Sequence, residues 1–144
     1  MLRSMIAILV GYIVLSLFFI VGFTTVYSLL GSDLVFRPET YAVTPLWWVF
    51  SAAIGLIGSA LAGYVCAVIS KNMRVCQVFA GIVFVILIIF SIPKMRNSTP
   101  RFRAGPIPTM EAMRATQMPI WLYILNPVLC ALGAVAGSRM KSSR

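Results

Sequence analysis

The stretch LWWVFSAAIGLIGSALAGYVCAVI, residues 46–69, decides the fold of this chain. It lies in a window, residues 40–70, that contains no charged side chain. A helix needs about 20 mostly apolar residues to cross the hydrocarbon core of a bilayer. Three further windows without charge, residues 4–32, 75–93 and 115–138, reach or nearly reach that length. The sequence therefore predicts a polytopic membrane protein with four membrane-spanning helices.

The predicted fold class is all-α, a four-transmembrane-helix bundle. We place the helices at about residues 5–30, 46–69, 75–93 and 119–138, with a connecting segment at 94–118. Because little of the chain is left outside these helices, residues 1–144 are expected to form a single membrane domain.

Glycine and proline residues mark the expected ends of the helices. The turn-type sequence Gly31-Ser32-Asp33 should end the first helix, and Pro93 should end the third. Pro127 lies two turns into the fourth helix, where it should produce a kink because it removes a backbone N–H.

The composition excludes a water-soluble globular domain. The chain is 60% hydrophobic and 10% charged, against about 25% charged residues in an ordinary soluble domain. Its net charge of +9 is carried by connecting segments and tails. Lys and Arg at such positions contact anionic lipid headgroups, so the expected partner is the lipid bilayer and not nucleic acid.

Charge also suggests an orientation. Four helices place both termini on one side of the membrane, and the twelve cations divide evenly between the two sides. The cations of the terminal side directly adjoin the predicted helices, where the positive-inside bias acts most strongly. This favours an orientation with both termini in the cytoplasm.

Two groups of residues on the non-terminal side are expected to contact headgroups. Trp47, Trp48 and Trp121 fit an aromatic belt, with a partner-binding patch as the alternative. In or beside the connecting segment, Arg96, Arg101 and Arg103 should contact headgroups or the acidic face of a partner. From Thr109, the pattern of the same segment predicts a short helix lying along the membrane surface.

The residue types that support familiar membrane chemistry are missing from the sequence. It contains no His, no Cys-x-x-Cys and no ionisable residue within a predicted span apart from its three cysteines and its tyrosines. These absences disfavour haem and zinc sites, thiol redox chemistry and proton-coupled transport. We therefore nominate no catalytic, cofactor-binding or metal-binding residue. Cys66, Cys76 and Cys130 are expected to be buried, reduced thiols.

Small residues recur at three- and four-residue steps in two of the predicted helices, and so lie on one face of each. These helix-packing residues are Gly55, Ser59 and Gly63 in the second helix, and Asn126, Gly133 and Gly137 in the fourth. Small residues let membrane helices approach closely. We expect the second and fourth helices to pack together, with homo-oligomerisation or docking on a larger complex as alternatives.

Two further residues mark possible contacts within the membrane. Asn126 could hydrogen-bond across helices or line a polar ligand cavity. The third helix has a bulky apolar sequence that should face lipid, and Gly81 is its one small contact point.

Four short motifs are similar to those of small bacterial four-helix inner-membrane proteins. They are the stretch from Arg3 through Gly11-Tyr12, Pro45-Leu46-Trp47-Trp48, Gly63-Tyr64-Val65-Cys66 and Asn126-Pro127. This resemblance implies a location and a topology, and it carries no functional residue to this chain.

Two functions are compatible with these features. The first is a non-catalytic accessory, scaffold or assembly component that binds a membrane-protein partner or a second copy through packing faces and the basic loop. The second is a carrier or binder of a small apolar or lipid-like ligand.

Overall fold

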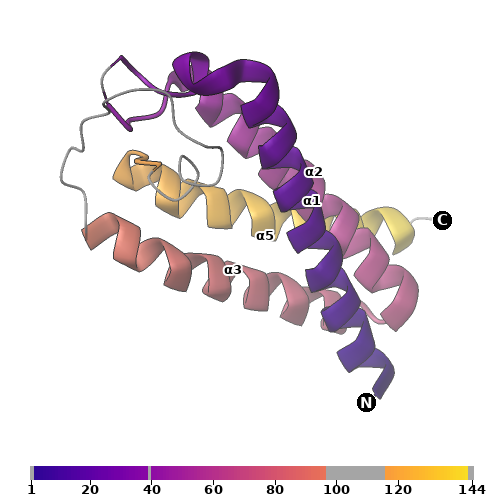
Figure 1. Cartoon of the computed structure of the whole chain (residues 1–144). Helices are drawn as coiled ribbons and strands as arrows, with labels where there is room; N and C mark the ends of the chain where they lie inside the picture. Colours follow the sequence, from indigo (N-terminus) through magenta and orange to yellow (C-terminus); the bar gives the residue numbers. More distant parts are fainter. Residues whose placement is uncertain (1, 39, 97–115, 143–144) are drawn as a thin grey trace.

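The structure is a computed structural model, and its described residues form four helices. It describes residues 2–38, 40–96 and 116–142. Within these ranges, the side chains of residues 32, 33 and 142 are not described. The helices are α1 (Leu2–Val35), α2 (Pro45–Ser70), α3 (Met73–Arg96) and α5 (Ile120–Ser142). All four are long and apolar enough to cross a membrane. The described ranges contain no strand. The predicted all-helical fold with four such helices is therefore confirmed (Figure 1).

The ends of α2 follow from its terminal residues. Pro45 is in the first turn, where its fixed φ and missing N–H suit the start of a helix. Lys71 follows the last turn in the left-handed conformation, with φ 53°, and its N–H donates to the carbonyl of Ala67 at 3.0 Å. This cap reverses the chain, so only Lys71 and Asn72 separate α2 from α3.

The expected helix end at Gly31 is confirmed, and the one at Pro93 is not. Gly31 has φ 67° and ψ 173°, which breaks the helix there, and the first candidate membrane span ends at this residue, although helical turns resume up to Val35. Pro93 lies inside α3, which continues to Arg96. A proline so close to the end of a helix removes one backbone hydrogen bond and leaves most of the last turn intact.

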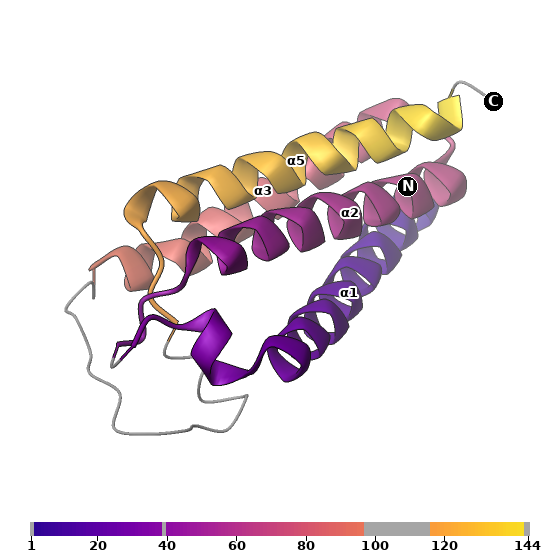
Figure 2. The same ribbon diagram turned by 90° about the horizontal axis from the view of Figure 1, so that it is seen from above.

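α2 lies at the centre of the bundle. It packs most extensively on α5 and then on α1, while α3 packs mainly on α5 and touches α1 least. Both termini lie at the same end (Figure 1), and α1 diverges from α2 towards the other end (Figure 2). Below, the end that carries both termini is called the terminal end and the opposite one the loop end. α2 and α5 both run from the loop end to the terminal end.

The main core fills the space between the helices near the terminal end. Phe79 of α3 is its largest fully buried side chain, and small residues surround it. A Cβ at Gly11 of α1 would lie only 3.2 Å from the Phe79 ring. The other members of this core are Ala7, Leu15, Ala62, Cys66, Ala67, Cys76, Ala80, Val83, Cys130 and Ala134.

A second, smaller core closes the loop end. The segment after α1 folds back on itself, with an isolated antiparallel bridge between Phe36 and Val43. The backbone N–H of Val43 donates to the carbonyl of Gln117 at 3.2 Å, and the N–H of Gln117 donates to Tyr41 at 3.0 Å. We call the described residues 36–38 and 40–44 the cap segment. Its Phe36 and Val43 form a buried cluster with Tyr27, Val35 and Trp47.

The predicted surface helix lies mostly outside the described residues. It was expected to begin at Thr109 and to include Gln117. Gln117 itself pairs with Ala42 in an isolated parallel bridge and is not helical.

Candidate functional site

The contact between α2 and α5 is formed by glycines that face backbone atoms. Gly63 lies against the backbone of Ala134, and Gly137 lies against the backbone of Ala60. A side chain at either glycine would overlap these atoms. The two helix backbones are therefore in direct contact, and the glycines are the reason that they can approach so closely.

The same contact continues toward the loop end. Gly133 faces the hydroxyl of Ser59, and a Cβ there would also lie 2.8 Å from the carbonyl oxygen of Leu56. Ser59 is completely buried, and its hydroxyl donates to that same carbonyl at 3.0 Å. Nearer the loop end, the thiol of Cys130 points at the carbonyl of Gly55, with 3.6 Å between sulfur and oxygen. The buried hydroxyl and thiol thus each have an acceptor.

Asn126 lies further toward the loop end on α5. Its side-chain oxygen is buried and has no hydrogen-bond partner among the described residues. A buried amide without a partner costs free energy in an apolar environment. None of the cavities described below is lined by Asn126. The residue is next to Pro127, which lies inside α5.

The three tryptophans are in different environments. Trp121 is half exposed and meets Trp48 edge to face, with ring centroids 5.4 Å apart and an interplanar angle of 82°. Trp47 is only 3% exposed and packs on Phe23 at 5.7 Å. The expectation that Trp47 contacts headgroups is corrected by this burial, because the cap segment and α1 cover the ring.

The predicted basic group is described only in part. Arg96 is exposed at the end of α3. Arg101 and Arg103 lie outside the described residues. At the terminal end, Arg3 of α1 donates from Nε to the carbonyl of Ile69 at 2.7 Å and so joins α1 to the last turn of α2.

Gly81, the one small residue expected to make a contact from the third helix, contacts no other described helix of this chain. No described atom would lie within 4 Å of a Cβ at this position. Gly81 is exposed on the outer face of α3, and so is Gln77, one turn earlier. Gly81 therefore leaves room for an approaching helix, and the polar side chain of Gln77 lies beside it.

Two apolar cavities, both open to the outside, lie between α1 and α3. One has a volume of about 370 Å³, the other about 80 Å³, and Tyr12 and Ile86 line both. The remaining lining residues are almost all apolar: Met5, Ile8, Leu9, Phe79 and Ile82 in the first cavity, and Leu15, Ser16, Phe19, Val83, Leu87 and Phe90 in the second. These cavities exist because α1 and α3 make the least contact of the packed pairs.

The sequence analysis did not identify the glycines that join α1 to α2. A Cβ at Gly22 would lie 3.1 Å from Ile54, and one at Gly58 would lie 2.6 Å from the Phe18 ring. The spacing of Gly11 and Gly22 could have predicted a packing face on α1. The two glycines are eleven residues apart, which is about three helical turns, so they lie on one face of the helix.

The described residues contain no group of three or more His, Cys, Asp or Glu side chains that could hold a metal ion. Comparisons with protein-family models, curated proteins and solved structures find no match to this chain. The function is therefore inferred from the arrangement of its own side chains.

Proposed function

We propose that this chain is an integral protein of the bacterial inner membrane that serves, without catalysis, as an accessory, scaffold or assembly component. It binds a helix of a partner membrane protein through the outer face of α3. The observation that carries this proposal is the open position at Gly81, where no described atom would lie within 4 Å of a Cβ.

The other glycine faces support this choice of surface. Gly63, Gly133 and Gly137 are already occupied by the α2–α5 contact, so they cannot also receive a second copy or a partner. Gln77 lies four residues before Gly81 and is exposed on the same face. In a bilayer, an amide on the helix surface gains a hydrogen bond when a partner helix covers it.

The test is gentle detergent extraction of the tagged chain, followed by identification of the proteins that co-purify. Gly81→Leu should fill the open position and remove the partner, and Gln77→Leu should weaken its binding. Val21→Leu is the matched control, because Val21 is 63% exposed on α1 and far from Gly81 in sequence. Retention of the same partner by Gly81→Leu would show that this face is not the binding surface.

The proposed orientation is tested separately. In a variant whose three cysteines are replaced by alanine, Ser143→Cys should react with an impermeant maleimide only from the cytoplasmic side. Ser32→Cys should react only from the opposite side. Labelling of Ser143→Cys from outside would reverse the orientation.

The apolar cavities between α1 and α3 favour a second candidate function, the binding of a lipid-like ligand. Their linings suit an acyl chain, and Ile86 borders both. A lipid that stays bound through purification and is lost in Ile86→Phe, with no protein partner present, would favour this candidate. A protein partner lost in Gly81→Leu would favour the first.

A further inference from the structure

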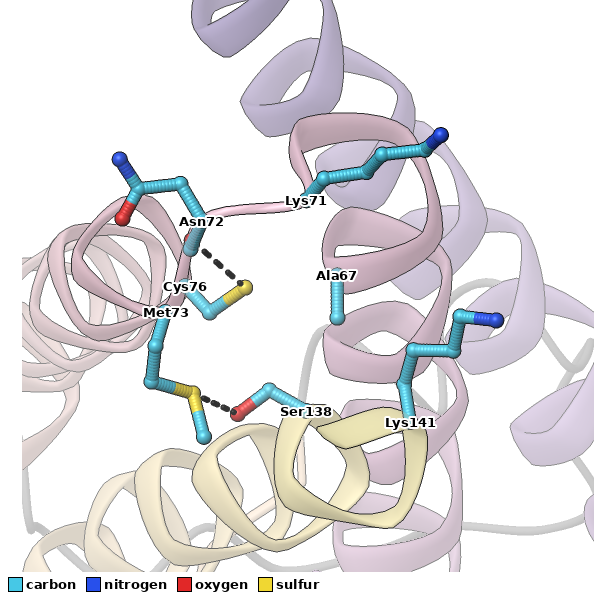
Figure 3. Close-up of a pocket in the computed structure, with 7 residues that line it drawn as sticks. All are labelled: Ala67, Lys71, Asn72, Met73, Cys76, Ser138 and Lys141. Atoms are coloured by element: carbon cyan, nitrogen blue, oxygen red, sulfur yellow. Dashed lines mark hydrogen bonds between the residues drawn. The ribbon is translucent and has the colours of Figure 1, made fainter. Parts of the chain in front are cut away.

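A pocket of about 250 Å³ opens at the terminal end, between the last turn of α2, the start of α3 and the last turns of α5. Figure 3 shows that these three elements surround it. We propose that this pocket binds a phosphate group. This inference rests on the proposed function only in assuming that the chain lies in a bilayer. The pocket is separate from the outer face of α3.

The wall of the pocket is held in place by its own weak hydrogen bonds. The hydroxyl of Ser138 donates to the carbonyl of Val135 at 2.7 Å within α5, and it also lies 3.5 Å from the sulfur of Met73 of α3. The thiol of Cys76 points at the carbonyl of Asn72 with 3.6 Å between the atoms. The contacts of Ser138 with Met73 and of Cys76 with Asn72 are drawn in Figure 3. Ser138, Met73 and Cys76 therefore already contact neighbouring groups, whereas the two lysines of the pocket have to be ordered when a ligand binds.

Two lysines supply the charge. Lys71 and Lys141 line the pocket and are exposed. In Figure 3 both side chains extend to the same side, past Ala67 and away from Asn72, Cys76 and Met73, so their ammonium groups point away from the space between these residues. Both lysines have flexible stems, and these stems have to rotate for the ammonium groups to reach an anion in the pocket.

No carboxylate of α2, α3 or α5 competes for these lysines. The acidic residues of the chain are Asp33, Glu39 and Glu111, and none of them belongs to these three helices. Arg3, Arg74 and Arg139 add further positive charge at the same end. An anionic ligand would therefore meet no acidic side chain that belongs to these three helices.

The partial charges of the helix ends partly oppose the binding of an anion. They have to be compared with the charges of the two lysines. A helix terminus acts as roughly half an elementary charge, negative at the C-terminus and positive at the N-terminus. The C-termini of α2 and α5 and the N-terminus of α3 adjoin the pocket, which sums to roughly half a negative charge. Two ammonium groups outweigh this sum. In addition, the carbonyls of Ala67 and Ile69 already accept hydrogen bonds from Lys71 and Arg3.

The size and place of the pocket identify the chemical class of the ligand. Its volume is below the range of about 300 to 1,000 Å³ that is typical of drug-sized ligands, so a small headgroup fits better than a large cofactor. The pocket adjoins the ends of three candidate transmembrane helices, the level at which lipid phosphates lie. The phosphate can belong to an anionic lipid or be free in solution.

The experiment uses the purified full chain in detergent micelles with equal amounts of phosphatidylglycerol and phosphatidylcholine, and measures retained lipid by mass spectrometry. Wild type should retain phosphatidylglycerol in preference to phosphatidylcholine. Lys71→Asn and Lys141→Gln should each lower this retention about fivefold, the effect of one cation near the membrane surface. Asn is chosen at position 71 because it tolerates the left-handed conformation.

Two variants separate a pocket from general charge attraction. Ala67→Leu fills the pocket and keeps every charge, so it should lower retention as much as the lysine variants. Arg139→Gln removes one charge from the same end of α5 without touching the pocket. It acts only through general attraction of charge, so it should lower retention less than Lys141→Gln does. Equal losses in Arg139→Gln and Lys141→Gln would overturn the proposal, and so would full retention by a folded Ala67→Leu. If Ala67→Leu does not fold, the proposal is tested by comparing the lipid retention of Lys141→Gln with that of Arg139→Gln.

A second arm distinguishes the source of the phosphate. Inorganic phosphate is added at an ionic strength matched with chloride, and the thermal unfolding of the chain is followed. Stabilisation by phosphate that is lost in Lys141→Gln would support a soluble ligand. Selective lipid retention without this stabilisation would assign the site to a headgroup. The absence of both effects would overturn the proposal.

Discussion

Gly63 of α2 lies directly against the backbone of Ala134 of α5. The two helices run in the same direction, so the same register continues along the contact, from Gly55 beside Cys130 to Gly137 beside Ala60. Helices in lipid gain little from hydrophobic burial and depend on close packing. The stability of the bundle should therefore be most sensitive at these glycines.

The first prediction concerns Gly63 and Gly133. Gly63→Ala places a methyl group on the backbone of Ala134, which forces α2 and α5 apart and should lower the free energy of unfolding by about 1–3 kcal/mol. Gly133→Leu should have a larger effect, because it also meets Ser59 and Leu56. The measurement is unfolding by SDS titration in mixed micelles, followed by circular dichroism.

Gly81→Ala is the matched control for this prediction. It makes the same substitution in a helix where no described atom would lie within 4 Å of the new methyl group. Its stability should be unchanged or higher by up to about 1 kcal/mol, since glycine is a poor helix former. Equal destabilisation by Gly81→Ala and Gly63→Ala would mean that helix propensity and not the α2–α5 contact is being measured.

The second prediction tests the register of α2 and α5 chemically. A Cβ at position 55 would lie 3.2 Å from the sulfur of Cys130, which suits an S–S bond of about 2.05 Å. Gly55→Cys should therefore form an intramolecular disulfide with Cys130 on mild oxidation, visible as a mobility shift on non-reducing gels. Gly81→Cys should form none within the chain. A Gly55→Cys variant that cross-links only between chains would place these glycines at an interface between copies.

The sequence predicts features that depend on residues close together in the chain better than features that depend on residues far apart in the chain. Windows such as residues 46–69 predict helices because a spanning helix satisfies its own backbone hydrogen bonds, which is a local requirement. The spacing of Gly55, Ser59 and Gly63 likewise defines one helix face. It does not define what covers that face, because the same small residues serve packing within one chain and between chains.

Features that depend on distant residues were not predictable in this way. Trp47 is buried because the cap segment folds over it, and that segment is joined to Gln117 by backbone hydrogen bonds between Val43 and Gln117 and between Gln117 and Tyr41. Nothing in the local sequence around Trp47 reports these pairings. Gly81 shows the opposite case: its size allows a close contact, but no described atom of this chain would lie within 4 Å of a Cβ there.

The third prediction concerns the ring contact between Trp48 and Trp121. Edge-to-face pairs contribute about 0.5–1.5 kcal/mol beyond the burial of their area. A double-mutant cycle with Trp48→Ala, Trp121→Ala and the double variant should give a coupling energy of this size in SDS unfolding. The cycle Trp47→Ala with Trp121→Ala is the control, because Trp47 packs on Phe23 instead. Equal coupling in both cycles would contradict the specific contact.

The last prediction concerns Arg3, whose Nε donates to the carbonyl of Ile69 at 2.7 Å. Ile69 belongs to the last turn of α2, where carbonyls have no partner within the helix, so the guanidinium both satisfies this carbonyl and joins α1 to α2. Arg3→Ala should lower stability by about 1 kcal/mol, since the bond is exposed to solvent. It should also speed hydrogen exchange in the first turns of α1. Arg74→Ala removes the same charge at the same end but keeps this bond, and it should leave α1 protected. If both variants expose α1 equally, general charge and not the Arg3 contact holds the helix in place.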